Sequence, residues 1–247
     1  MITKNKISKI KLLHQKKFRE LEGLFIVEGT KSILELLKSD FITTELWATN
    51  TWLDMYAHYI APEIEISPLT PAELERISIL TTPQEVLAIA KMPQPTATDL
   101  NSNKPLIVLD DIRDPGNLGT IIRTADWFGI RQILASPQSV EFTNPKTIQA
   151  TMGSFTRVKV VYKNIADYLS LRQDHPSVIG AFMDGTPISK TTFQNNSIII
   201  IGNEANGISK TLFPFINQKV TIPAYDQHTE SLNASIAAAI FMYKLSL

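Results

Sequence analysis

The chain has 247 residues, 44% of them hydrophobic and none a cysteine, so it can bury a substantial core without disulfide bonds. The lack of cysteine excludes thiolate nucleophiles, iron–sulfur clusters and cysteine-based zinc sites. The four histidines are dispersed along the sequence, and we expect no metal site. We find no apolar run long enough to span a membrane and no secretory signal pattern, so we expect a soluble protein in the cytoplasm without membrane contact.

The net charge is zero, but the charges are unevenly distributed. The first 19 residues hold seven basic side chains and no acidic one, which leaves 17 basic against 24 acidic residues in the rest of the chain. A local excess of this kind indicates either a surface that contacts phosphates or an ordinary solvated terminal helix. If the surface binds RNA, the residues that we expect to contribute are Lys9, Lys16, Lys17 and Arg19.

The N-terminal part alternates helix and strand patterns. Ile7, Ile10 and Leu13 recur at helical spacing, and a strand over residues 23–29 precedes a helix over 30–40 that Thr30 is placed to cap. Further elements are predicted in the order strand 44–49, helix 52–60, strand 63–67, helix 71–80 and strand 85–90. This alternation predicts a compact α/β domain over residues 1–91, with a parallel or mixed sheet. Residues 92–104, rich in Pro, Thr, Asn and Ser, are predicted to be a linker.

The C-terminal part, residues 105–247, is predicted to form a second α/β domain. Short apolar strands are expected at 105–112, 132–136, 157–161, 177–183, 197–202 and 219–223. The continuous run Ile198–Ile201 suits a central strand buried on both faces. A last helix is expected to pack through one apolar face made of Leu232, Ile236, Ala239, Ile240 and Tyr243.

Three segments place polar residues where a strand runs into a loop or helix. In the first, residues 109–129, Asp114 is the predicted N-cap and Gly129 the C-cap of a helix that carries Asn117 and Arg123. The second, residues 197–209, runs from a buried strand into a loop that contains Glu204. The third, residues 220–240, leads into the last helix past Ser231, a possible N-cap, and Asn233.

Each of these residues also has an ordinary structural explanation. From local pattern alone, Asn117 and Glu204 suit turns, Arg123 suits a solvated helix face and Ser231 suits a helix cap. His228 stands alone and fits an exposed loop. The loop that follows Gly202 matches neither the dinucleotide-binding fingerprint nor the phosphate loop that requires a lysine, so a Rossmann oxidoreductase or class I methyltransferase is disfavoured.

Taken together and in this order, the three segments resemble the motifs of the SpoU (TrmH-like) family of RNA 2′-O-ribose methyltransferases, part of the SPOUT class. The stretches that carry the resemblance are DPGNLGTIIRTADWFG, IIGNEANGIS and IPAYDQHTESLNASIA. Residues 6–37 resemble the small RNA-substrate-binding domain that many members carry. Ala224, the loop 225–229, and Ala205 with Asn206 depart from common family residues, which affects the expected shape of the cofactor pocket.

The resemblance implies a fold, a cofactor and a site. We expect a trefoil-knotted, mainly parallel sheet, a homodimer formed through the catalytic domains, and S-adenosylmethionine as methyl donor. The implied catalytic residues are Asn117, Arg123, Glu204, Ser231 and Asn233. The implied cofactor-binding residues are Met183, Asp184, Gly185, Gly202, Asn203, Ile222, Ser231 and Leu232.

Two questions stay open at this stage. Arg123 could accept the proton of the ribose hydroxyl, as the family resemblance implies, or it could bind phosphate and stabilise alkoxide charge, which fits a guanidinium better because that group stays protonated. The substrate is expected to be ribosomal rather than transfer RNA. The alternative function is a catalytically inactive RNA-binding or ribosome-assembly factor with the same fold.

Overall fold

The computed structural model of the chain describes residues 2–93, 100–172, 176–225 and 231–247. The chain divides into two compact units. The N-terminal unit comprises Met1–Thr96 and Glu141–Thr156, and the C-terminal unit comprises Ala97–Val140 and Arg157–Leu247. No helix in the described residues is long and apolar enough to cross a membrane.

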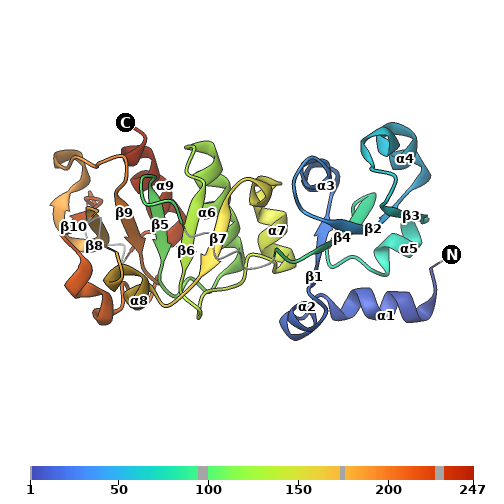
Figure 1. Cartoon of the computed structure of the whole chain (residues 1–247), viewed down its shortest axis with the longest axis horizontal. Coiled ribbons are helices and arrows are strands. Elements are labelled where there is room, and N and C mark those ends of the chain that lie inside the picture. Colours follow the sequence, from blue (N-terminus) through green and yellow to red (C-terminus); the bar gives the residue numbers. More distant parts are fainter. Residues whose placement is uncertain (1, 94–99, 173–175, 226–230) are drawn as a thin grey trace. The chain divides into compact units, whose positions relative to one another are not determined.

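The N-terminal unit contains a four-stranded mixed sheet in the order β1-β4-β2-β3 (Figure 1). Strand β4 runs antiparallel to β1 and β2, and β2 runs parallel to β3. The elements of this unit are α1 (Lys4–Leu12), α2 (Lys16–Glu22), β1 (Leu24–Glu28), α3 (Thr30–Leu37), β2 (Thr43–Ala48), α4 (Asn50–Tyr56), η1 (Ala57–Tyr59), β3 (Glu65–Pro68), α5 (Pro71–Glu75), β4 (Val86–Lys91), α7 (Pro145–Thr151) and η2 (Ser154–Thr156).

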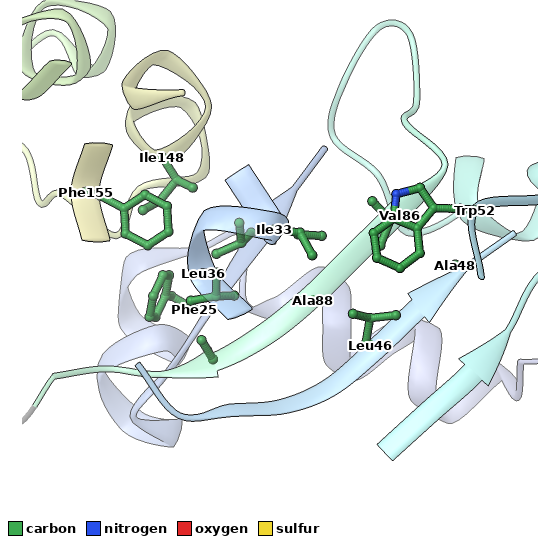
Figure 2. Close-up of a cluster of buried hydrophobic side chains, with 12 residues drawn as sticks. Phe25, Ile33, Leu36, Leu46, Ala48, Trp52, Val86, Ala88, Ile148 and Phe155 are labelled. Atoms are coloured by element: carbon green, nitrogen blue, oxygen red, sulfur yellow. The ribbon is translucent and has the colours of Figure 1, made fainter. Parts of the chain in front are cut away.

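Both faces of this sheet are covered by apolar side chains. Because successive side chains of a strand point to opposite faces, β4 divides its residues between two clusters. Val86 and Ala88 lie in the cluster that contains Trp52 and Phe25, drawn in Figure 2. Leu87 and Ile89 lie in the other cluster, with Ile7, Ile10 and Leu13 from the first helix and the residue after it. The predicted apolar stripe of that helix is therefore confirmed.

Two local predictions in this unit were wrong. Thr30 does not cap α3, because Gly29 is the N-cap residue and the Thr30 hydroxyl instead accepts a hydrogen bond of 3.0 Å from the Trp52 indole. The helix predicted over 71–80 is only one short helix, α5, which ends at Glu75. Its start follows the expected rules, with a capping box between Thr70 and Glu73.

Residues 141–156 lie between two strands of the C-terminal unit in the sequence but cluster with the N-terminal unit. Helix α7 and the 3-10 helix η2 contact α3, and α7 contacts β1. Ile148 and Phe155 of this segment belong to the same buried cluster as Phe25 (Figure 2). The rings of Phe25 and Phe155 meet edge to face, with centroids 6.1 Å apart. This compact unit therefore includes a segment that follows the predicted linker.

The C-terminal unit contains a six-stranded sheet in the order β10-β8-β9-β5-β6-β7 (Figure 1), and every neighbouring pair is parallel. Its elements are β5 (Leu106–Leu109), α6 (Pro115–Trp127), β6 (Gln132–Ala135), β7 (Lys159–Tyr162), α8 (Ile165–Ser170), β8 (Val178–Pro187), η3 (Ile188–Lys190), β9 (Ile198–Ile201), η4 (Lys210–Phe215), β10 (Gln218–Thr221) and α9 (Ala234–Leu245). The predicted mainly parallel α/β fold is confirmed.

Helices cover both faces of this sheet. Leu106, Val108, Ile198 and Ile200 form one buried cluster with side chains from α8 and η4. By alternation, Ile107, Leu109, Ile199 and Ile201 point to the opposite face, and α9 packs against both β9 and α6. The strand Ile198–Ile201 is at most 2% exposed, as expected for a central strand covered on both sides.

Helix α6 begins as predicted, but its C-cap is Phe128 and not Gly129, which is the next residue. The Asp114 carboxylate caps it by accepting a 2.7 Å hydrogen bond from the Asn117 amide, and Pro115 occupies the first turn. Gly129 follows the helix with a φ of 72°, in the left-handed region that glycine adopts without strain. The apolar stripe that helical spacing predicts on α6, Leu118, Ile121, Ile122 and Ala125, is fully buried.

Helix α9 corrects two predictions. Its N-cap is Asn233, whose Oδ1 accepts hydrogen bonds from the amides of Ser235 and Ile236, and not Ser231. The face that packs inside the chain consists of Ala234, Ser235, Ala238, Phe241 and Met242. On the predicted apolar face, Leu232, Ile236 and Tyr243 are 44%, 51% and 54% exposed. The apolar face exists, but it points away from this chain's own core.

Candidate active site

Three of the five predicted catalytic residues meet at the carboxyl edge of the parallel sheet. Asn117 lies in the first turn of α6, which follows β5, and Glu204 lies in the loop that follows β9. Since β5 and β9 are neighbouring parallel strands, these two segments emerge side by side (Figure 1). Asn233, the N-cap of α9, joins them because α9 packs against α6.

A directional hydrogen-bond relay joins these side chains. The Asn117 Nδ2 donates to the Glu204 carboxylate, and the Asn233 Nδ2 donates to the Asn117 Oδ1 at 2.9 Å. The Asn233 Oδ1 accepts from the first amides of α9. The groups at the two ends of the relay fix the direction of its hydrogen bonds, because a carboxylate only accepts and the main-chain amides of α9 only donate. Asn117 and Asn233 are each held in one amide orientation.

The other two predicted catalytic residues are near members of the relay in the sequence but form no hydrogen bond with them. Arg123 is on the same helix as Asn117, and Ser231 is two residues before Asn233. Arg123 is on the exposed side of α6, as predicted from its place off the apolar stripe, and its guanidinium has no hydrogen bond or ion pair with any residue that the structure describes. Ser231 is exposed and lies two residues before the cap of α9. Both side chains are available to a substrate.

Most of the predicted cofactor-binding residues lie in or directly after three neighbouring strands, β10, β8 and β9, whereas Ser231 and Leu232 directly precede the cap of α9. Ile222 comes directly after β10 and Gly202 directly after β9, while Met183, Asp184 and Gly185 lie in the outer part of β8. That part of β8 bulges out, because its pairing with β10 jumps from Gly180 to Thr186. The segment from Met183 to Gly185 is exposed, and the Thr221 hydroxyl donates a 3.0 Å hydrogen bond to the Met183 carbonyl.

Two glycines of this group allow close backbone packing. A Cβ on Gly202 would lie 2.3 Å from the Gly207 carbonyl carbon, and a Cβ on Gly185 would lie 2.6 Å from the Lys219 carbonyl oxygen. Any side chain at either position would force these loops apart. The backbone at Gly185 and Gly202 thus packs closely against neighbouring segments, while the residues Met183–Gly185 are exposed and can meet a ligand.

The predicted RNA-binding residues divide into two groups. Lys9, Lys16 and Lys17 are exposed on α1 and α2. Arg19 was predicted wrongly: its side chain is 2% exposed, it donates to the Leu13 carbonyl at 3.0 Å, and it pairs with Glu141. Arg19 is held inside the unit because its charge is matched there by a carboxylate and a carbonyl.

Sequence reasoning missed the residues that brace the site. A cavity of about 320 Å³, lined by Asp110, Asp111 and Ser136 among others, opens beside the same edge, and none of the five predicted catalytic residues lines it. Asp111 has a φ of 60°, which is unusual for a residue other than glycine. The Ser136 hydroxyl accepts a 2.9 Å hydrogen bond from the Asp111 amide. Nothing in the local sequence pattern marks these residues.

Comparison with known proteins places the chain in a family. Residues 104–243 match the model of the SpoU rRNA Methylase family, and residues 4–88 match that of the MRM3-like substrate binding domain. The 23S rRNA (guanosine(2553)-2'-O)-methyltransferase RlmP of Bacillus subtilis strain 168 is 30% identical over 242 residues, which cover 97% of this chain and 95% of the relative.

Solved structures agree with this assignment. A protein of the TrmH family from Porphyromonas gingivalis is 34% identical, with a TM-score of 0.89 over 99% of this chain and 98% of that one. An AdoMet-bound rRNA methyltransferase from Sinorhizobium meliloti is 25% identical, with a TM-score of 0.88 over 99% and 95% of the two chains. The chain therefore belongs to the SpoU rRNA methylase family, as its three motifs predicted, and is an RNA methyltransferase.

Proposed function

We propose that the chain transfers the methyl group of S-adenosylmethionine to a ribose 2′-hydroxyl of ribosomal RNA. The relatives from B. subtilis and S. meliloti are named as rRNA methyltransferases, the first of them specific for a 2′-O position. The observation in this chain that supports the proposal best is the relay Glu204–Asn117–Asn233, which joins one residue from each family motif.

The reaction requires a ribose hydroxyl held in line with the methyl group, and its oxygen must lose a proton. The relay offers fixed polar groups at the carboxyl edge, while Ser231 beside it is free to contact a ribose or phosphate. We assign Arg123 to the phosphate and to the negative charge that develops on the hydroxyl oxygen. A guanidinium suits this role because it stays protonated and donates several hydrogen bonds.

S-adenosylmethionine, when bound, supplies an electrophilic methyl group on its sulfonium. The chain would hold it through the exposed residues Met183–Gly185 and through Gly202, Ile222 and Leu232, the last of which directly precedes the cap of α9. The backbone in these loops is kept in place by the close contacts at Gly185 and Gly202. The role of the chain is to position the donor and to exclude water from the reacting atoms.

The RNA is recognised first by the N-terminal domain, for which we keep the bounds 1–91, followed by the linker 92–104 and the catalytic domain 105–247. Lys9, Lys16 and Lys17 point into solvent from two short helices, as a phosphate-contacting surface requires. The match of residues 4–88 to a substrate-binding domain supports the same role. With ribosomal RNA as substrate, the protein acts in the cytoplasm.

We further propose that the protein is a homodimer through its catalytic domain. The outward apolar face of α9 includes Ile236 and Tyr243, and Trp127 at the end of α6 is 84% exposed. The Phe128 ring, next to Trp127, lies 6.1 Å from the Tyr243 ring, so the end of α6 and the end of α9 are close together. Large exposed apolar side chains on two neighbouring helices favour burial against a second copy. Sedimentation should show a dimer that Ile236→Asp dissociates.

The trefoil knot is also a proposal. Strand β10 lies at the outer edge of the sheet beyond β8, whereas α9, which follows it in the sequence, packs against β9 and α6. The described elements on either side of this connection thus lie at the outer edge and at the middle of the sheet, as in the knotted path that the family resemblance implies. Chains usually avoid such paths, so the knot rests on the family fold.

The test is methyl transfer from labelled S-adenosylmethionine to rRNA from cells that lack the gene, followed by mapping of the labelled nucleotide. We expect label on a ribose 2′-oxygen. Glu204→Ala should abolish most of it, and Asn195→Ala, at an exposed residue before the amino end of β9, should not. Calorimetric binding of S-adenosylmethionine without any methyl transfer would instead favour an inactive RNA-binding factor.

A further inference from the structure

Every polar atom of Asn203, the residue before Glu204, is hydrogen-bonded inside the protein. Its Oδ1 accepts from the amides of Ala205 and Asn206 at 2.9 and 3.2 Å, which folds the loop tightly around Glu204. Its Nδ2 donates to the Asp111 carbonyl at 2.9 Å. Its main-chain N–H and C=O pair with Gly207. The polar atoms of Asn203 therefore serve the loop itself, and of its side-chain donors only the second N–H of Nδ2 has no partner among the described residues.

The carbonyl that Asn203 binds belongs to a strained corner. Asp111 holds a φ of 60° just after β5, in the segment that leads to Asp114 and Asn117. The Ser136 and Ser139 hydroxyls accept from the amides of Asp111 and Ile112, at 2.9 and 3.0 Å, and keep the corner in this conformation. Such strain persists only where neighbouring contacts over-determine the backbone.

A second contact ties the far end of the Glu204 loop to the same corner. The buried Asp110 carboxylate accepts a 2.7 Å hydrogen bond from the Ser209 amide. The loop from Asn203 to Ser209 is therefore fastened at both ends to the corner at Asp110 and Asp111. Glu204 projects from this loop to Asn117, which follows the same corner.

These contacts close a ring. Starting from Asn203, the path runs through the Asp111 carbonyl, along the chain to Asn117, across to the Glu204 carboxylate, and back along the chain to Asn203. We propose that Asn203 is a positioning residue for methyl transfer. Its amide sets the distance between the loop of the second motif and the helix of the first, and thereby the place of Glu204 against Asn117. The inference rests on the proposed function. It assigns the Asn203 side chain to the positioning of Glu204 and not, as the resemblance implied, to binding of the cofactor.

Two substitutions distinguish the role of the Asn203 side-chain oxygen, which accepts hydrogen bonds, from that of its nitrogen, which donates one. Asn203→Ala removes all three side-chain hydrogen bonds. Asn203→Asp keeps an acceptor for the two loop amides but cannot donate to the Asp111 carbonyl. We expect each to lower kcat about 10- to 100-fold, as loss of a supporting contact does elsewhere, with less than about a threefold change in the Kd for S-adenosylmethionine. The control is Asn217→Ala, which removes a 2.7 Å bond to the Val178 amide at the amino end of β8 and should leave kcat unchanged.

A double-mutant cycle distinguishes positioning from general destabilisation. If Asn203 acts through Glu204, Asn203→Ala should add little to the loss of kcat already caused by Glu204→Ala. Full additivity would overturn the proposal, as would wild-type kcat for Asn203→Asp, or an unchanged kcat with a weakened Kd for S-adenosylmethionine. Absence of methyl transfer by the wild-type chain would instead refute the proposed function, so the two failures are distinguishable.

Discussion

The two units of the chain present polar side chains to their ligands in different ways. Lys9, Lys16 and Lys17 are exposed on two short helices that are adjacent in the sequence. Asn117 reaches Glu204 across 87 residues and Asn233 across 116, and all three are fixed by hydrogen bonds. The first arrangement acts through charge, which is additive and screened by salt. The second acts through geometry, which isosteric substitutions disrupt.

The largest effect in the catalytic unit is expected at Arg123, which is exposed on α6, the helix that carries Asn117. Arg123→Ala should lower methyl transfer by about 10²- to 10³-fold, because it removes a donor to charge that develops on oxygen. Arg123→Lys keeps the charge but not the fork of donors, so it should recover little of the loss. Single-turnover rates at saturating S-adenosylmethionine are the measurement. Near-normal methylation by the lysine variant would show that no bidentate guanidinium is needed.

Arg19 does not belong to the exposed basic surface of the N-terminal unit, so its substitution should affect stability. Because its guanidinium is buried beside Glu141, Arg19→Ala should lower the free energy of unfolding by about 3 kcal/mol. Lys17→Ala, two residues away and exposed, should change it by less than about 0.5 kcal/mol. Urea titration followed by circular dichroism compares the two. Equal stabilities would mean that the buried pair contributes nothing.

The charge-based surface should respond to salt. Replacing Lys9, Lys16 and Lys17 together by glutamine should weaken RNA binding about tenfold and reduce the slope of log K against log salt by about 2 to 3. Lys16 should contribute least, because its ammonium already lies 3.9 Å from Glu20 and Glu141. Filter binding at several salt concentrations measures this, with Lys190→Gln as the control. An unchanged slope would mean that the lysines are merely solvated.

The smallest expected effect concerns pH. Burial lowers the pKa of His14 below its usual 6.5, with Arg19 and Lys11 acting in the same direction, although the bond to the Ile77 carbonyl opposes them. The unfolded chain therefore takes up the proton first, so stability is full above 6.5 and is lost as the pH falls through the folded pKa. His14→Gln should flatten the fall of Tm between about pH 7.5 and 5.5. Parallel curves for both proteins would exclude His14 as the cause.

Local sequence signals predicted what local physics controls. The buried run Ile198–Ile201, the Asp114 cap and the exposed side of α6 that carries Arg123 all followed from patterns within a few residues. The family motifs added the set to which Asn117, Glu204 and Asn233 belong. That these three bond to one another appears only in the fold.

The features that the sequence did not reveal depend on distant partners. Arg19 resembles its basic neighbours until Glu141 is brought beside it. The apolar face of α9 is apparent from its spacing, but which face packs against α6 is decided by the rest of the unit. The bond from Asn203 to Asp111 spans 92 residues and ends on a main-chain carbonyl, which leaves no mark on residue type.

The relay itself can be tested with one substitution. In Asn233→Asp, the carboxylate still caps α9 but cannot donate to Asn117, so the helix should persist while the relay is cut. The decisive measurement is the single-turnover rate of 2′-O-methylation of rRNA, with Tm and the Kd for S-adenosylmethionine measured alongside. We predict a rate at least about tenfold below wild type with both other quantities nearly unchanged. A wild-type rate would contradict the claim that this relay organises methyl transfer.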